Sequence, residues 1–181
     1  GKLFYFLYLP ATSRSFVYDV ELDLWMLWAV SGVTSPFIMV SVVQTTGSSN
    51  RIFIQNISDG RILELLTTTY QDLVAGTATD FTFQVRTKRQ DNDSIKRKFC
   101  HSLVVLGDQQ SATDTTTDIS IQYSDDDYVN TSTARTVNMG STRPFIKAIG
   151  SYRRRSWTIS HTGNSPMRLS GIEVVTSEGD Y

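Results

Sequence analysis

The chain has 181 residues, of which 40% are hydrophobic and 11% aromatic, enough to bury one good core or two small ones. Its 17 basic and 18 acidic side chains nearly cancel, and this balance argues against a histone-like nucleic-acid binder. The single cysteine, Cys100, excludes an internal disulfide framework and leaves no thiol partner for a zinc site. It also weakly favours assembly in a reducing cytosol.

The opening segment, residues 1–9, is apolar and aromatic but lacks the basic lead-in and the cleavage signal of a signal peptide. No uninterrupted apolar run approaches the length of a membrane span, so no membrane partner is expected. The segment has the pattern of a strand, and the chain starts with Gly1 rather than Met. We therefore expect the sequence to be part of a larger polypeptide.

The first third of the chain contains a repeat with an offset of 37 residues, in which segment 16–25 aligns with 53–62 and Arg14 with Arg51. Each unit has the pattern strand, polar loop, strand, Asp- or Asn-led turn, strand. Strands are expected at 3–9, 16–20 and 25–28, and the second unit starts at 37–43. Repeats of this length with short aromatic strands predict about two blades of a partial β-propeller.

Asp19 and Asn56 are expected to hold the turns of the two units, because their side chains can accept a hydrogen bond from the backbone two residues on. Three aromatic residues of the first unit, Tyr18, Trp25 and Trp28, have two interpretations. They are a platform for stacking sugars or nucleobases, or they pack between neighbouring blades, which is more typical of rings at this spacing.

A polar, Thr-rich stretch at about 66–80 predicts a domain junction, giving a propeller part at 1–75 and a second domain at 76–181. The second domain has sharp period-2 alternation and no convincing helical period. Strands are expected at 81–85, 98–106, 116–123, 135–139, 145–149, 157–161 and 167–175. The fold class is therefore all-β, with propeller blades followed by a jelly-roll-like β-sandwich.

The carboxyl end, residues 152–174, has the pattern of two strands around one tight turn at 163–166. Trp157 and His161 share one strand face by alternation. In the second strand, the alternation of apolar and polar residues shifts by one position at Ser170-Gly171. We expect a β-bulge there, since glycine tolerates the left-handed backbone that a bulge often needs.

No residue pattern marks a catalytic, cofactor or metal site. The acidic run Asp125 to Asp127 lacks the spacing of a calcium loop and is more typical of a solvated turn. No sequence pattern places a metal ligand or a nucleophile next to His101. His161 is expected to be a half-buried hydrogen-bonding residue. Cys100 is expected to be a small core residue. Nothing indicates an enzyme.

Charge is distributed unevenly: segment 86–98 sums to +4, segment 143–155 to +5 and segment 108–127 to −6. Three interpretations remain open, namely docking between subunits, contact with DNA phosphates, and neutralisation within one sheet surface. Alternation places Arg153 and Arg155 on the side of Trp157 and Arg154 on the other. The candidate subunit interface comprises Lys96, Arg97, Lys98, Asp125, Asp126, Asp127, Arg153, Arg154 and Arg155.

Several motifs, in this order, resemble the carboxyl-terminal part of the packaged-DNA stabilisation proteins of short-tailed phages, also called tail nozzle or hub proteins. They are residues 16–25, 96–99, 121–127, 149–157, 161–164 and 166–169. The resemblance implies a propeller-bearing subunit of a homo-oligomeric ring, usually a hexamer, below the portal and adaptor. Its expected location is the virion tail, after assembly in the host cytoplasm.

The resemblance also implies that the ring retains packaged DNA and forms part of the ejection channel, without sequence-specific binding. Its partners would be the adaptor, portal-proximal proteins and a tail needle or fibre, and no catalytic residues carry over. Basic side chains are then expected at subunit contacts, since a basic lumen would grip phosphates. The alternative is a carbohydrate-binding or adhesin module presenting Tyr128, Tyr152 or Trp157. A polysaccharide-cleaving enzyme has no support from paired carboxylates.

Overall fold

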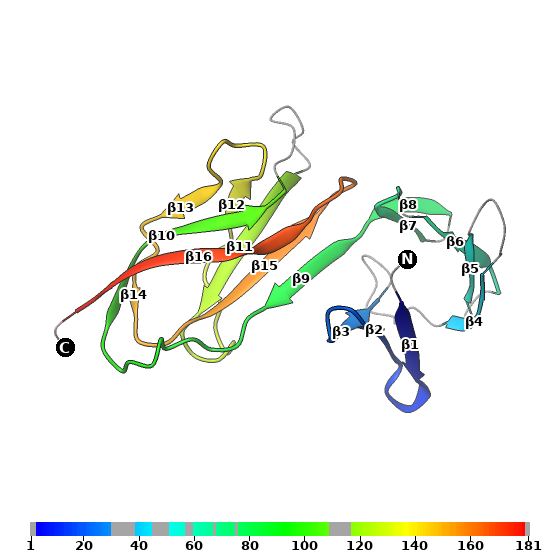
Figure 1. The fold of residues 1–181 in the computed structure, drawn as a ribbon, viewed down its shortest axis with the longest axis horizontal. Helices are drawn as coiled ribbons and strands as arrows, with labels where there is room; N and C mark the ends of the chain where they lie inside the picture. The colour runs from blue at the N-terminus through cyan, green and yellow to red at the C-terminus, as the bar shows by residue number, and fades with distance from the viewer. Residues whose placement is uncertain are drawn as a thin grey trace. The chain divides into compact units, whose positions relative to one another are not determined.

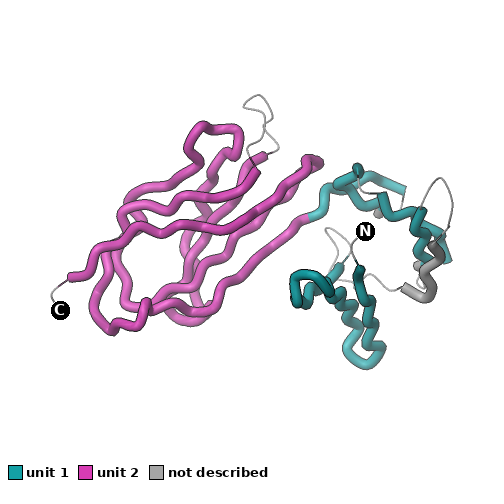
Figure 2. Tube along the Cα trace, in the orientation of Figure 1, with its two compact units in different colours: residues 1–81 teal, residues 82–181 magenta. Residues whose placement is uncertain are grey.

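The computed structural model describes residues 3–29, 39–44, 51–56, 60–66, 68–74, 76–108 and 117–179. These residues form antiparallel strands, with one short 3-10 turn, Pro10–Thr12, as their helical element, so the predicted all-β class is confirmed (Figure 1). The chain divides into two compact units, residues 1–81 and 82–181 (Figure 2).

The first sheet of unit 1 has the order β1-β2-β3, with β1 at Phe4–Leu9, β2 at Arg14–Asp19 and β3 at Leu24–Trp28. The turn from β2 to β3 is held by Asp19, whose Oδ1 accepts hydrogen bonds from the backbone N–H groups of Glu21 (2.9 Å) and Leu22 (3.1 Å). The role predicted for Asp19 is thereby confirmed. The side chain of Asn56 lies outside the described residues.

The second sheet has the order β4-β5-β6, with β4 at Met39–Gln44, β5 at Ile52–Asn56 and β6 at Ile62–Leu65. Phe16 pairs with Leu27 in the first sheet, and Phe53 pairs with Glu64 in the second, so both partners are displaced by the same 37 residues. The sequence repeat is therefore also a repeat of register for the last two strands of each sheet, whereas the pairing of β4 with β5 is shifted by one residue from that of β1 with β2. Positions 37 and 38 of the second expected unit lie outside the described residues.

Two buried side chains mark the same place in these sheets. Val17 is 1% exposed and Ile54, 37 residues later, is 2% exposed. Among the described residues of unit 1 they are the two buried hydrophobic side chains, whereas unit 2 buries twelve. A separate hairpin, β7 (Gln71–Val74) and β8 (Thr77–Asp80), follows the second sheet. The described side chains of the two repeat sheets thus build little core of their own.

Unit 2 contains two four-stranded antiparallel sheets. One has the order β12-β11-β15-β9. In the other, β16 pairs along the length of β10, while β13 and β14 pair in succession with its opposite edge. The strands are β9 (Thr82–Arg86), β10 (Lys98–Gly107), β11 (Asp118–Ser124), β12 (Arg135–Asn138), β13 (Phe145–Lys147), β14 (Ser151–Tyr152), β15 (Ser156–Thr162) and β16 (Leu169–Glu178).

All seven strands predicted for this part of the chain are present, with small shifts of their ends; the two-residue β14 was not predicted. Both sheets contribute to one hydrophobic core. Leu103 of β10, Ile119 of β11 and Trp157 of β15 are buried in it, and Leu169 and Ile172 of β16 pack against it. The alternation of apolar residues along these strands accounts for this core.

The turn after β15 does not form a hairpin. β15 pairs with β11 and β9, whereas β16 pairs with β10 in the other sheet (Figure 1). The chain therefore passes from one sheet to the other between residues 163 and 168. The strands and the turn between them were predicted, but the sequence pattern does not specify their partners.

The predicted bulge in β16 is present. Leu106 pairs with Gly171 and Gly107 with Leu169, which leaves Ser170 as the extra residue. The reason given for it was wrong, because Gly171 is not among the residues with a left-handed backbone. A second register shift occurs in β10 at His101.

Candidate functional site

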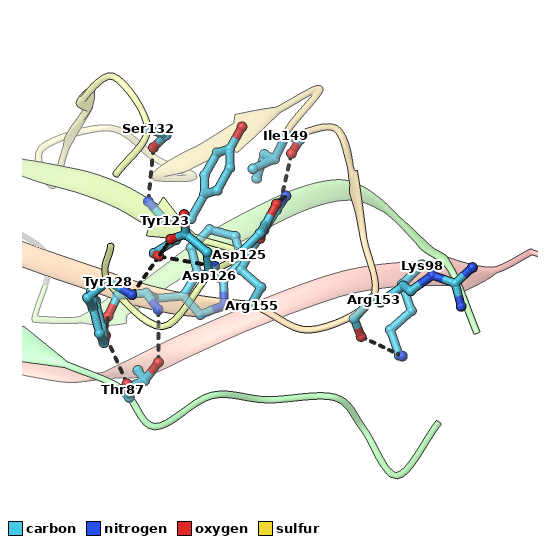
Figure 3. A network of polar contacts seen from close by, with 12 residues as sticks. Thr87, Lys98, Tyr123, Asp125, Asp126, Tyr128, Ser132, Ile149, Arg153 and Arg155 are labelled. Atoms are coloured by element: carbon cyan, nitrogen blue, oxygen red, sulfur yellow. Dashed lines mark hydrogen bonds and ion pairs between the residues drawn. The ribbon is translucent and has the colours of Figure 1, made fainter. Parts of the chain in front are cut away.

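Arg155, expected at a subunit contact, lies inside unit 2 with 1% of its surface exposed. Its Nε and Nη2 donate to the two carboxylate oxygens of Asp125 at 2.7 and 2.9 Å, and its Nη1 donates to the carbonyl of Ile149 at 2.8 Å (Figure 3). Paired hydrogen bonds of this kind match the planar guanidinium to a carboxylate. The charge of Arg155 is therefore compensated within the unit.

Aromatic rings surround the same guanidinium. Its central carbon lies 3.8 Å from the ring centroid of Tyr123 and 4.2 Å from that of Tyr152. Trp157 is more distant, at 5.5 Å. Rings at these distances attract a cation, and the attraction is stronger where water is excluded. The alternation that places Arg155 on the side of Trp157 was the signal for this burial.

Lys98 is also buried, at 1% exposure. Its Nζ donates to the carbonyls of Ser94 (2.6 Å), Lys96 (3.2 Å) and Arg153 (3.2 Å). These three acceptors satisfy the three ammonium protons. Burial removes Lys98 and Arg155 from the expected interface, because neither can present its charge to a neighbouring subunit. The shared alternation of Lys98 with Cys100 on β10 was the sequence signal.

The acidic turn after β11 is built from side chain to backbone contacts. Asp126 accepts hydrogen bonds from the backbone N–H and the side-chain amide of Asn130, and from the hydroxyl of Ser124. The backbone hydrogen bond from Asn130, followed by these side-chain bonds, lowers the pKa of Asp126. The Tyr128 hydroxyl donates to the neighbouring carbonyls of Thr87 and Trp157, which ties the turn to the end of β9 and the start of β15 (Figure 3).

The three carboxylates of this turn face different partners. Asp125 binds Arg155, Asp126 binds Asn130, and Asp127 lies 3.5 Å from Arg89 and 3.6 Å from Arg154. The pairs of Asp127 are about half exposed, so each contributes little to stability. Opposite charges from separate segments thus meet inside one unit, as the interpretation of internal neutralisation requires.

The remaining candidate cations lie at the surface. Lys96, Arg97, Arg153 and Arg154 are exposed. One nitrogen of Arg153 donates to the carbonyl of Ile95 at 3.0 Å. These four side chains, together with the exposed carboxylates of Asp125 and Asp127, are the members of the expected interface that a neighbour can most readily reach.

The rings expected to present a glycan are mostly inside the unit. Tyr152 is 7% exposed and Trp157 is 1% exposed. Tyr128 is half-buried, and its hydroxyl is used by two carbonyls. A stacking platform needs ring faces open to the ligand, so these positions do not support the adhesin interpretation.

Cys100 is buried in the core, as predicted, and burial raises the pKa of its thiol. His161 forms the expected hydrogen bond, between its Nδ1 and the carbonyl of Asp118 at 3.0 Å, although it is more deeply buried than expected. No cluster of possible metal ligands occurs in the part of the chain that the structure describes. Within the same residues, no helix has the length and apolar character needed to cross a membrane.

Tyr18 and Trp25, two of the three rings considered as a platform, lie on an exposed apolar face of the first sheet of unit 1, and Trp28 lies on the opposite face. The participation of Tyr5 in this face was not predicted. Tyr5, Tyr18 and Trp25 are paired across the three strands, with ring centroids 6.5 Å and 4.9 Å apart in that order. Trp25 is 54% exposed. The sequence signal was the opening run at residues 3–9. Its side chains are apolar on both faces of the strand, whereas a half-buried strand is apolar on one face only.

No protein-family model matches the sequence, and the search of curated proteins finds no match. The likeness to phage tail proteins therefore stays a resemblance of ordered motifs.

Proposed function

We propose that the chain is a structural subunit of a phage tail, of the nozzle or hub type, which forms a homo-oligomeric ring below the portal and adaptor. The observation that carries this proposal is the contrast between the two units. Unit 2 has a closed core, whereas the described residues of unit 1 include two buried hydrophobic side chains and many exposed ones. A subunit with such sheets gains stability when further sheets cover them.

The two repeat sheets are proposed as partial blades of a β-propeller. A propeller blade is covered by a neighbour on each face, so both faces of its strands carry apolar side chains. The first sheet has this composition: Phe6 and Val17 lie on one face, and Leu7 and Phe16 on the other. The shared register of β2 with β3 and of β5 with β6 supports the same interpretation.

Unit 2 is proposed as the β-sandwich, of the jelly-roll type, that accompanies the blades. Two four-stranded sheets with a joint core support a sandwich, and the passage from β15 to β16 is a connection between its sheets. The role of this unit is mechanical. Arg155 and Asp125 connect the acidic turn, the segment before β14 and the start of β15.

The proposed ring retains packaged DNA and releases it through a central channel, without reading its sequence. A lumen that passes DNA should carry few unpaired cations, because fixed positive charges bind phosphates. Pairing of Arg89 and Arg154 with Asp127, and of Arg155 with Asp125, reduces the free positive charge of unit 2 and supports this role. The expected partners are the adaptor, portal-proximal proteins and a needle or fibre.

Electron microscopy of the purified full chain tests the proposal. The expected images show rings with a central hole, with six subunits as the first expectation. Particles without a hole, or single subunits at concentrations of tens of micromolar, would contradict it. A glycan-binding screen provides the second measurement: specific binding that is lost on substitution of Tyr128 would favour the adhesin alternative.

A further inference from the structure

The two sheets of unit 2 differ in width. β13 and β14 share one edge of β10, so the sheet of β10 is one strand narrower than the sheet of β9. On one side of the unit β12 lies beside β13, since Arg135 of β12 donates from Nη1 to the carbonyl of Lys147 at 2.6 Å. β9 and β16 are therefore the outer strands on the other side (Figure 1). Among the described residues, no strand of the narrower sheet lies opposite β9.

Apolar side chains along this side are only partly covered. Val85 of β9 pairs with Ile159 of β15, so both point to the same face of their sheet, yet Val85 is 42% exposed and Ile159 is 2% exposed. On β16, Ile172 and Val174 pack against the core but are half-buried, whereas their partners on β10 are buried. We call Val85, Ile172 and Val174 the open seam.

The backbone of β16 directs hydrogen-bonding groups to the same side. The N–H of Cys100 donates to the carbonyl of Gly150, on the edge of β10 away from β16. Cys100 pairs with Thr176, and in an antiparallel pair the backbone groups of opposite residues point either toward each other or both away. Thr176 therefore directs its N–H and C=O away from β10, and by alternation so do Val174 and Ile172.

This edge of β16 is also long and unprotected. β16 has ten residues and contains neither lysine nor proline, two residues that commonly protect a free edge. No strand among the described residues pairs with it. A free edge of this kind is a template for one more strand, because its N–H and C=O groups have the spacing of a sheet.

We propose that the free edge of β16 accepts an extended strand from a different protein. The strand pairs with the backbone of Ile172, Val174 and Thr176, and apolar side chains at its alternate positions cover the open seam. A basic side chain on its other face lies next to Glu173, which alternates with the seam residues and is exposed. The inference concerns unit 2 alone and goes beyond the proposed ring.

The position beside β16 fits a single strand and not a second copy of the chain. Antiparallel pairing of two β16 edges would place β9 of each copy where β15 of the other lies, because β9 extends one strand beyond β16. The described strands of a second copy are also already paired in their own sheets. An extended segment of another polypeptide has neither obstacle, since it adds one strand to the narrower sheet.

Hydrogen exchange of the full chain, followed for each amide by NMR, tests the inference. A donor strand of about seven residues is fused to the carboxyl end through a glycine–serine linker, which raises its local concentration to about the millimolar range. The strand alternates valine with threonine and has one lysine in a threonine position. The amides of Ile172, Val174 and Thr176 should exchange rapidly in the unchanged chain, and the donor strand should slow them by about 100-fold or more.

Two controls separate the backbone contribution from the apolar one. A donor strand with threonine in place of every valine keeps the backbone hydrogen bonds but covers the seam poorly, and should protect these amides about 10-fold less. Thr176→Pro in the chain with the valine strand removes one outward N–H, at a place where an edge strand tolerates proline. It should abolish the protection while the circular dichroism spectrum stays unchanged.

Three outcomes would overturn the inference. If the three amides are already protected in the unchanged chain, another part of the chain or a second copy covers the edge. If the valine strand leaves their exchange rapid, the edge does not accept a strand. If the valine and threonine strands protect equally, the open seam is not part of the site. None of these results bears on the ring, which electron microscopy tests separately.

Discussion

Arg155 and Asp125 form a paired hydrogen bond between residues 30 positions apart, and the two members differ in environment: the arginine side chain is 1% exposed and the aspartate 42%. One end of the pair is therefore in the core and the other is in contact with water. The cost of breaking such a pair lies mainly in the buried charge that is left behind.

Replacing Asp125 with alanine should destabilise unit 2 by about 2 kcal/mol. This value is below the ~3–5 kcal/mol that fully buried pairs lose, because water can reach the carboxylate side. Urea denaturation monitored by tryptophan fluorescence measures it, since Trp157 is in the same core. The control is Arg154→Ala, which breaks an exposed pair and should change stability by no more than about 0.5 kcal/mol. Equal effects of the two substitutions would contradict the assignment.

Replacing Lys98 with methionine keeps the aliphatic stem and removes the ammonium that binds three carbonyls. The loss should be about 1–3 kcal/mol, because these acceptors lose their donor in a partly buried place. The exposed neighbour Lys96 provides the control, since Lys96→Met removes the same charge without this loss. Thermal unfolding of both variants measures the difference, and a Lys98 variant as stable as its control would show that the carbonyls are solvated.

Replacing Ile54 with alanine should destabilise unit 1 by about 2–4 kcal/mol, since the side chain is buried in the second repeat sheet. Ile62→Ala in the same sheet is the matched control, because that side chain is 70% exposed and should contribute about 0.5 kcal/mol or less. The rate of limited proteolysis within residues 1–81 reports on this unit separately from unit 2. Equal sensitivity of the two variants to protease would mean that the repeat has no buried position.

The lowered pKa of Asp126 makes its turn sensitive to acid. A carboxylate whose pKa is lower in the folded than in the unfolded chain adds stability above the unfolded value of about 4, and this stability disappears as pH falls through the folded pKa. The Asp126→Asn variant should therefore be less stable than the unchanged chain at pH 6, and the difference should shrink below about pH 4. Urea midpoints measured at both pH values test this, and a difference that is constant with pH would contradict it.

The sequence predicted the strands of unit 2 well because alternation depends on which side of a strand is buried. It also predicted the turn at Asp19 and the bulge at Ser170, which depend on local chemistry and on a change of phase. It did not predict that β15 and β16 belong to different sheets. Strand alternation specifies a buried face but not a hydrogen-bonded neighbour, and that choice depends on contacts between distant residues.

The burial of Arg155 and Lys98 was not predicted either, since charged side chains normally lie at the surface. Each lies on the core side of its strand, beside Trp157 or Cys100, and alternation alone would have placed it there. The sequence did not reveal which groups compensate these buried charges. The carboxylate of Asp125 compensates Arg155, and three backbone carbonyls accept hydrogen bonds from Lys98.

The pairing of the last two long strands has a consequence for the order in which the chain folds during synthesis. Phe83 pairs with His161, and Lys98 pairs with Glu178, so one sheet of unit 2 is complete only after β15 and the other only after β16 has left the ribosome. The first sheets, by contrast, join strands that are close neighbours in sequence and can form as they emerge. Loss of the residues after Arg155 would remove one strand from each sheet, which leaves β9 without a partner strand and one edge of β10 unpaired and prone to aggregation.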